Sequence, residues 1–211
     1  MILKLNIQIQ KILKTTSSLI LGVDEVGRGC IAGPVCAGVV ILKPQSKTNL
    51  SLYVDSKKIN ESVREQLAEE IRREHLCALG WASVAEIDKL NIRQASLLAM
   101  KRAIDNLILI QKINPHDCLI LVDGRDIIPN LDHVDQHSVI KGDQLVRQIS
   151  AASIVAKVAR DQLMKKLSLE QPQYGFEKHK GYGTEKHRNA IKKFGITEIH
   201  RKTFGGVKEY I

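Results

Sequence analysis

The sequence of 211 residues has few aromatic residues and no long apolar run. Phe, Trp and Tyr make up 4% of the chain, which disfavours a function that stacks nucleic-acid bases on a row of aromatic rings. The longest apolar stretches, such as Val35 to Leu42, have the length of a strand rather than the roughly 20 residues of a membrane span. We therefore expect no membrane segment.

Cysteine is also scarce, and its spacing fits neither a zinc site nor a disulfide framework. The chain has Cys30, Cys36, Cys77 and Cys118, with no Cys-x-x-Cys pair and no partnering histidine pattern. A chain of this length buries about 70% of its unfolded surface, so it can fold without either. No secretory cleavage pattern is present. We expect buried, reduced thiols in a cytoplasmic protein.

Positive charge is what the sequence has in excess. It contains 32 Lys and Arg residues against 23 Asp and Glu residues, which gives a formal net charge of +9. Such a balance favours a polyanionic partner such as nucleic acid, although a solvated basic surface explains many basic proteins. The charge alone leaves both interpretations open.

The pattern of apolar residues predicts one mixed α/β domain. Strands are expected over Leu19–Val26, Pro34–Leu42, Leu76–Val84, Cys118–Val122 and a short segment around Val139. Residues 3 to 10 alternate between apolar and polar, which is typical of an extended lead-in or an edge strand.

Four helices are expected between and after these strands. One follows a cap at Asn60, with Val63, Leu67 and Ile71 on one face, and the others cover Ile92–Ile110, Asp143–Leu167 and a segment from Thr184 to about Phe194. The middle of the long third helix, Ser150–Ser153, is made of small residues that would let its backbone approach a neighbour. Residues 174–184 are expected to form a loop.

Four acidic residues stand where strands end or a helix starts. Asp24 and Glu25 precede the turn at Gly27, Asp123 ends a buried strand, and Asp143 begins the long helix. Ligands bind beyond the carboxyl ends of strands in open α/β sheets. Neighbouring strand residues point to opposite faces, so a bend would be needed for Asp24 and Glu25 to share a site. A helix cap for Asp143 and an ordinary turn for Asp123 are the structural alternatives.

Carboxylates gathered in one place repel one another, and a divalent cation relieves this repulsion. Ligands that are all oxygen suit Mg²⁺ or Mn²⁺ rather than zinc. A pair of such ions can activate a water and stabilise the leaving oxygen in phosphodiester hydrolysis. A metal-dependent nuclease therefore accounts for both the acids and the basic net charge.

The residues around these acids resemble a known family. The run Gly22-Val-Asp-Glu-Val-Gly-Arg-Gly29, followed by Ala32-Gly-Pro-Val35, is similar to the signature of ribonuclease HII, the type 2 ribonuclease H. Further family motifs follow in the family's order at Asp55–Lys57, Leu121–Gly124, Lys141–Asp143, Ile149–Lys157, Arg160–Asp161, Gly181–Thr184 and His200–Phe204. Together they cover roughly residues 18 to 204. Cys30 and Arg125 depart from residues common in the family, and neither departure removes a motif acid.

The resemblance implies a fold, an activity and a set of roles. The fold would be an RNase H-like, five-stranded mixed sheet flanked by helices with a C-terminal helical part, within a catalytic domain of residues 18–211 after a lead-in of residues 1–17. The activity would be endonucleolytic cleavage of RNA–DNA hybrids and incision at single ribonucleotides in duplex DNA, by a monomer that uses Mn²⁺ or Mg²⁺. The metal ligands would be Asp24, Glu25, Asp123 and Asp143.

The resemblance also implies residues that bind substrate. Gly27, Arg28 and Gly29 would recognise the ribonucleotide, and Tyr182 would lie on the neighbouring deoxyribose. The physical basis is that only the 2′-hydroxyl distinguishes RNA from DNA at a given site. Without the resemblance, a buried tyrosine that packs the last helix would be favoured for Tyr182. Ser56 and Lys57 are expected to contact phosphates, with solvated loop residues as the alternative.

Several other polar residues are not assigned to the chemistry. Asp161 lies about 27 Å along an unbroken helix from Asp143, so we interpret it as structural, paired with Arg160 or Lys157. His179, His187 and His200 are expected at the surface or behind the site, since hydrolysis with two metal ions does not require a histidine base.

Three rival functions are separable by sequence features. Ribonuclease HIII would lack the Gly-Arg-Gly turn and carry an additional N-terminal domain, whereas only about 17 residues precede the first motif here. An inactive hybrid-binding module would be expected to have lost one of the four acids. A glycosidase also uses paired carboxylates, but it would not explain the basic charge.

Overall fold

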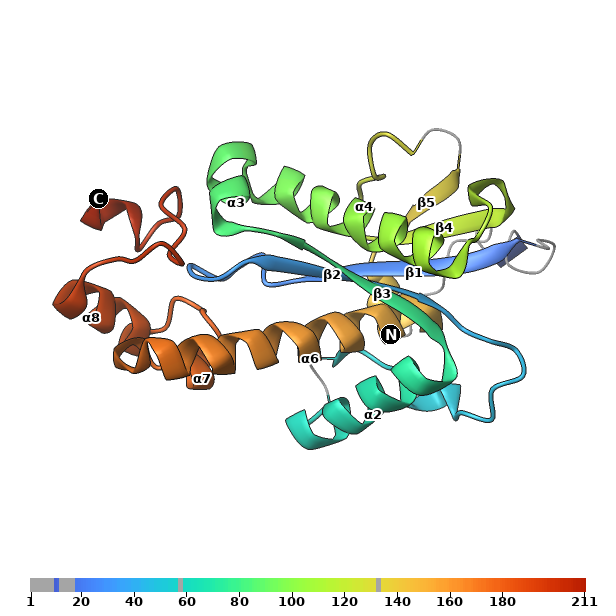
Figure 1. Ribbon diagram of the computed structural model, residues 1–211, viewed down its shortest axis with the longest axis horizontal. Helices are drawn as coiled ribbons and strands as arrows, with labels where there is room; N and C mark the ends of the chain where they lie inside the picture. The colour runs from blue at the N-terminus through green and yellow to red at the C-terminus, as the bar shows by residue number, and fades with distance from the viewer. Residues whose placement is uncertain (1–9, 12–17, 57–58, 132–133) are drawn as a thin grey trace.

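A five-stranded mixed sheet lies at the centre of the computed structural model, which describes residues 10–11, 18–56, 59–131 and 134–211 (Figure 1). Its strands are ordered β3-β2-β1-β4-β5. The central strand β1 (Leu19–Val26) is antiparallel to β2 (Val35–Ile41) and parallel to β4 (Cys118–Asp123). The outer strands are β3 (Leu76–Ala82), antiparallel to β2, and β5 (Asp135–Val139), parallel to β4. The expected mixed sheet is confirmed.

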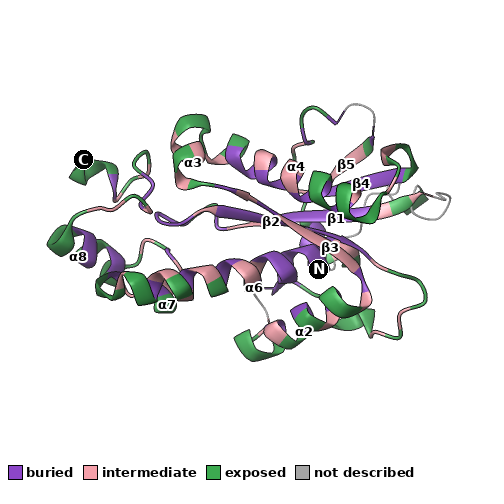
Figure 2. Ribbon diagram, viewed as in Figure 1, coloured by how far each residue is buried: buried purple, intermediate pink, exposed green. Residues whose placement is uncertain are grey.

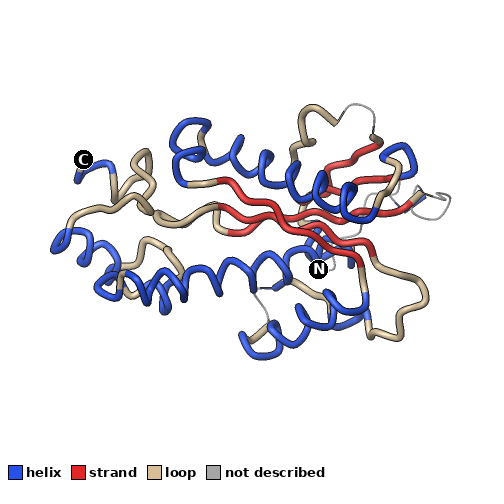
Figure 3. The backbone as a smooth tube through the Cα atoms, in the orientation of Figure 1, coloured by secondary structure: helices blue, strands red, loops and turns tan. Residues whose placement is uncertain are grey.

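Helices cover both faces of this sheet (Figures 1 and 3). The helices α3 (Val84–Leu90) and α4 (Ile92–Gln111) lie on one face, and α2 (Glu61–Glu74) and α6 (Arg147–Glu170) lie on the other. Strand β2 is buried along its whole length, as a strand covered on both faces should be (Figure 2). The apolar core is therefore divided into two layers, one on each side of the sheet.

The long helix α6 approaches the sheet very closely. A Cβ atom on Gly22 of β1 would lie 2.2 Å from the backbone carbon of Gln148, so only glycine fits there. The small residues Ser150 to Ser153 are all buried against the sheet. The expected close approach is confirmed, and it brings the first turns of α6 beside the carboxyl end of β1.

A C-terminal helical part continues beyond the sheet, as expected (Figure 1). It contains α7 (Phe176–His179) and α8 (Glu185–Phe194), and it has its own apolar cluster. The Thr184 side chain caps α8 by accepting a hydrogen bond from the backbone N–H of His187. Helix α7 lies inside the segment 174–184, which we expected to be a loop.

The structure corrects two predicted element boundaries. The third strand ends at Ala82 rather than Val84, because Ser83 forms a capping box with Glu86 and starts the unpredicted helix α3. The single helix expected over Asp143–Leu167 is wrong: the extended backbone of Val146 separates a short helix, α5 (Gly142–Leu145), from α6.

Two smaller predictions also fail, those for Val63 and Cys77. Val63 was expected on the buried face of α2 with Leu67 and Ile71, but it is exposed. The extended segment expected over residues 3–10 lies outside the described residues except for Gln10, which is helical together with Lys11. Cys77 is only partly buried, unlike the other three cysteines.

Within the described residues, no helix has the length and apolar character that a membrane span requires.

Candidate active site

The four acids singled out by sequence line one cavity of about 230 Å³ at the carboxyl ends of β1 and β4. The same cavity is lined by every expected substrate-binding residue that the structure describes. Its lining consists of Asp24, Glu25, Val26, Gly27, Arg28, Gly29, Ser56, Asp123, Asp143, Ser153, Lys157 and Tyr182. Lys57, which was also expected here, lies outside the described residues.

Asp24 and Glu25 share the cavity without the bend that we expected. The pairing of β1 with β2 continues in register to Val26, so the strand stays regular through both acids. The pairing of β1 with β4 ends earlier, at Val23. Both acids therefore lie beyond the last pair with β4, where the end of the sheet is open to the cavity.

Asp123 and Asp143 are joined by the start of α5. The Oδ1 atom of Asp123 accepts a hydrogen bond of 2.6 Å from the backbone N–H of Gly142, which precedes Asp143. Lys141, not Asp143, occupies the cap position of α5, so the helix-cap alternative for Asp143 is wrong. Gly124 has a φ of +106°, so the turn after Asp123 is real, yet the Asp123 side chain still lines the cavity.

Burial and mutual repulsion disfavour ionisation of the first two acids. Burial, followed by the charges of Glu25 and Asp123, raises the pKa of Asp24 well above its usual range. Burial also raises the pKa of Glu25, although the guanidinium of Arg28 opposes this effect. A divalent cation would favour the ionised forms, so this donor set fits a hard metal ion.

The side chains are turned toward local donors. Among the described residues, no three His, Cys, Asp or Glu side chains are arranged to hold a metal ion between them. The Arg28 guanidinium donates to Oε1 of Glu25 at 3.1 Å, and the backbone N–H of Glu25 donates to Oδ1 of Asp24 at 2.7 Å.

The Gly27–Gly29 turn requires glycine at its first position. Gly27 has a φ of +100°, and a Cβ atom there would lie 2.2 Å from Nε of Arg160. Gly29 borders the ring of Tyr182, since a Cβ atom on Gly29 would lie 3.9 Å from Cε1 of that ring. The turn and Tyr182 thus form neighbouring parts of one cavity wall.

Tyr182 is not the buried packing residue that was the alternative for it. Its exposed fraction is 42%, and it lines the cavity. Ser56 is different, because it is 2% exposed and its hydroxyl is hydrogen-bonded to that of Ser153 at 3.0 Å. Contact between Ser56 and a phosphate stays a prediction.

Two fully buried arginines brace this wall, and sequence reasoning did not assign them this function. Arg160 donates to the carbonyls of Ala32, Pro34 and Lys180, which joins the segment after the glycine turn to the one before Tyr182. Arg201 donates to the carbonyls of Arg28 and Gly33. Burial, and then the charge of Arg160, lowers the pKa of Arg201 to about 10.

Arg160 had a signal in the sequence. It follows Ala152 and Ala156 at four-residue spacing, which places a charge on the buried face of the predicted helix. The expected pairing of Asp161 with Lys157 is confirmed at 2.8 Å, and Arg160 instead binds backbone carbonyls.

His187 and His200 are fully buried behind Tyr182, so a surface position is wrong for both. The N–H of Thr197 donates to Nδ1 of His200, and the Nε2 atoms of the two histidines lie 3.2 Å apart. Nδ1 of His187 lies 2.9 Å from the carbonyl oxygen of Tyr182, which can only accept. These contacts assign the protons to Nε2 of His200 and Nδ1 of His187 and leave both rings neutral.

Comparison with known proteins gives consistent matches over most of the chain. The family model of ribonuclease HII matches residues 21–207. Ribonuclease HII of Pelagibacter ubique (strain HTCC1062) is 48% identical over 193 residues, which is 92% of this chain and 99% of that relative.

Solved structures match the fold. A chain in the PCNA:RNase HII complex from Archaeoglobus fulgidus has a TM-score of 0.70 and 25% identity, over 89% of this chain and 95% of that chain. Bst-RNase HIII in complex with Mn²⁺ has a TM-score of 0.72 and 17% identity, over 94% of this chain and 70% of that chain. The expected RNase H-like fold is confirmed.

Proposed function

The chain belongs to the ribonuclease HII family and is a metal-dependent ribonuclease H, and on that premise we propose its substrates, its site and its metal use. It hydrolyses the RNA strand of RNA–DNA hybrids and also incises duplex DNA at single embedded ribonucleotides. The observation that carries this proposal is the single cavity that holds the four acids, the Gly-Arg-Gly turn and Tyr182 together. The proposed metal ligands and the residues that can contact a single sugar therefore lie side by side.

The acids are the metal ligands in this proposal. Asp24, Glu25, Asp123 and Asp143 hold Mg²⁺ or Mn²⁺, and four carboxylates offer enough oxygens for two ions. When bound, such ions would activate the attacking water and stabilise the leaving oxygen. Arg28 can exchange its ion pair with Glu25 for a substrate phosphate, because its side chain is half exposed.

Discrimination of RNA from DNA comes from the cavity wall formed by the Gly27–Gly29 turn and Tyr182. The backbone of Gly27–Gly29 has no Cβ atoms that would keep a ribose at a distance, so its polar groups can reach a 2′-hydroxyl. The ring of Tyr182 lies beside this turn and would accept a deoxyribose, whereas a second ribose would crowd it. A junction with RNA on one side and DNA on the other fits this pair of contacts.

A ribonuclease HIII function is the nearest alternative, and the overall fold does not separate the two. The TM-scores to the HII complex chain and to the HIII structure are nearly equal, at 0.70 and 0.72. The Gly-Arg-Gly turn and the match to the ribonuclease HII family favour the present assignment.

The proposal includes a cytoplasmic monomer. All four cysteines are free thiols, which fits a reducing compartment.

A panel of three labelled duplexes tests the proposal. The purified protein is incubated with an RNA–DNA hybrid, a DNA duplex with one ribonucleotide and an all-DNA duplex, each with Mg²⁺, Mn²⁺ or EDTA. We expect cleavage of the first two only, and only with metal. Cleavage of the hybrid but not of the single ribonucleotide would contradict the role of the junction, and cleavage in EDTA would contradict the role of the acids.

A further inference from the structure

Lys157 is a cation on the cavity wall that the proposed mechanism leaves without a role. It projects from α6 one turn after Ser153, and both residues line the cavity with the four acids. Its side chain is 16% exposed, so the hydrocarbon stem is covered. A charged side chain held in this way beside an acidic cavity is more ordered than an ordinary surface lysine.

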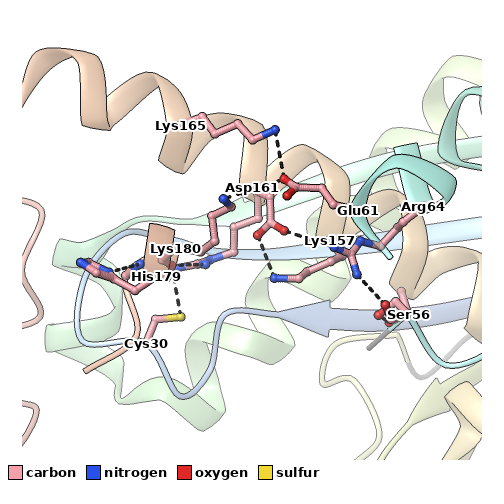
Figure 4. Close-up of polar contacts among 12 residues, drawn as sticks. Cys30, Ser56, Glu61, Arg64, Lys157, Asp161, Lys165, His179 and Lys180 are labelled. Atoms are coloured by element: carbon pink, nitrogen blue, oxygen red, sulfur yellow. Dashed lines mark hydrogen bonds and ion pairs between the residues drawn. The ribbon is translucent and has the colours of Figure 1, made fainter. Parts of the chain in front are cut away.

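Asp161 holds this lysine in place, one further turn along α6. The Nζ atom of Lys157 lies 2.8 Å from Oδ1 of Asp161, while Nη2 of Arg64 lies 3.9 Å from Oδ2 of the same carboxylate (Figure 4). Asp161 is buried, with an exposed fraction of 4%. A buried carboxylate with two cations fixes both of them, since leaving any of the three without its partners would be costly.

Arg64 extends this arrangement to the segment before α2 that contains Ser56. Its Nη1 atom donates to the carbonyl of Ser56 at 2.7 Å (Figure 4). The same atom also donates to the carbonyl of Ile59 at 3.0 Å. One carboxylate therefore organises the α6 wall and the Ser56 segment together. Two cations share this single acid, which leaves a surplus positive charge next to the cavity.

We propose that Lys157 binds a substrate phosphate beside the one that is attacked, and that Asp161 is its positioning residue. This inference rests on the proposed nuclease function. A polynucleotide brings neighbouring phosphates to the cavity, and the four acids repel them. An ammonium held at the edge of that acidic group offsets the repulsion, and its three donors suit a phosphate oxygen.

The experiment compares Lys157→Met with a matched control, Lys101→Met. Lys101 pairs with Asp105 in the same i to i+4 spacing at 2.7 Å, but it lies on α4 across the sheet. Binding of a DNA duplex with one ribonucleotide is measured against salt concentration, in an Asp123→Asn background so that no cleavage occurs. We expect Lys157→Met to make the negative slope of log K against log salt shallower by about one, and Lys101→Met to leave it unchanged.

Further variants separate charge from position. Lys157→Arg should retain the salt slope, whereas Asp161→Asn should retain the slope and raise KM in the cleaving enzyme by about 3-fold. Lys157→Met should raise KM by about 10-fold, with kcat within about 3-fold. The double variant Lys157→Met/Asp161→Asn should be no worse in KM than Lys157→Met alone.

An unchanged salt slope in Lys157→Met would overturn the proposal. Equal changes of the salt slope in Lys157→Met and Lys101→Met would also overturn it. Additive losses in the double variant would overturn the positioning role of Asp161. The salt titration needs no cleavage, so its outcome is independent of the panel of duplexes. An enzyme that fails to cleave would therefore overturn the proposed function without deciding the role of Lys157.

Discussion

The two walls of the cavity are built in different ways. The acidic wall stands on regular elements, since Asp24 and Glu25 lie just before the last residue of β1 and Asp123 ends the neighbouring parallel strand β4. The wall that carries the Gly27–Gly29 turn and Tyr182 consists of loops. These loops are joined by the isolated bridge between Cys30 and Tyr182 and by the buried side chains of Arg160 and Arg201.

The pKa values of the buried groups in the two walls are also shifted in opposite directions. Burial raises the pKa of Asp24 and Glu25, so ionisation of the carboxyl groups in the acidic wall is disfavoured. Behind the loop wall, burial lowers the pKa of both His187 and His200 to about 4, so these rings are kept neutral. The acidic wall is therefore suited to bind cations, while the loop wall uses buried polar groups to fix its loops.

Removal of one acid should give the largest effect. Asp123→Asn keeps the size of the side chain but removes a ligand charge, so cleavage of the single-ribonucleotide duplex should fall by about 10³-fold or more. Binding of the duplex should change little, because phosphate contacts elsewhere supply most of the affinity. Rates are measured with saturating Mg²⁺.

Asp105→Asn is the control for this variant, since Asp105 is a surface acid of α4 on the far side of the sheet. It should cleave at the wild-type rate. Retained activity in Asp123→Asn would remove Asp123 from the metal site.

The buried histidines should give an intermediate effect on stability. Their pKa is about 4 in the folded protein and about 6.5 when unfolded, so the unfolded chain binds more protons between these values. The free energy of unfolding contributed by the pair is therefore present above about pH 6.5 and is lost as the pH falls toward 4. The loss should be about 3 kcal/mol for each histidine, because its pKa differs by about 2.5 between the folded and unfolded protein, and it is measured by urea denaturation at several pH values.

His200→Gln isolates this contribution from that of the acids, whose raised pKa acts in the opposite direction. The variant should be less stable than wild type at pH 7, and it should lose less stability on acidification. His116→Gln, at an exposed position, should keep the wild-type pH dependence. Parallel pH curves for wild type and His200→Gln would show that the pair does not titrate as the contacts imply.

We expect the smallest effect from removal of the Tyr182 ring, which is the loop wall's proposed contact with substrate. Tyr182→Ala should reduce cleavage at a single ribonucleotide by about 10-fold relative to cleavage of a long hybrid, because only the former depends on one defined junction. Tyr210→Ala is a matched control, since Tyr210 is exposed to almost the same extent, 43% against 42%. Equal losses on both substrates would assign Tyr182 to binding in general rather than to the junction.

The acidic wall could be predicted from sequence because its signals are local. Asp24 and Asp123 each follow an apolar run of strand length, and parallel neighbours end at the same edge of a sheet. The break at Val146 could not be predicted in this way, since nothing in the residues 143–167 interrupts the helical periodicity. Its consequence was small, because Asp143 still reaches the cavity from α5.

The substrate-binding role of the loop wall could be predicted only from the resemblance to a family. The buried side chains that hold these loops were not predicted. Arg201 and His200 contact residues some 170 positions earlier in the chain, such as Arg28 and the bridge partner Ala32. Unlike Arg160, Arg201 and His200 have no local pattern that marks them as buried, and charged residues are seldom found inside. Only the tertiary contacts show that these residues hold a turn.

Metal binding by the acidic wall is the central claim, and calorimetry tests it most directly. Mn²⁺ is titrated into the wild-type protein and into Asp24→Asn/Asp123→Asn, with folding checked by circular dichroism. We predict saturable binding of Mn²⁺ to the wild type and loss of this binding in the double variant. Equal binding by both proteins would contradict the account.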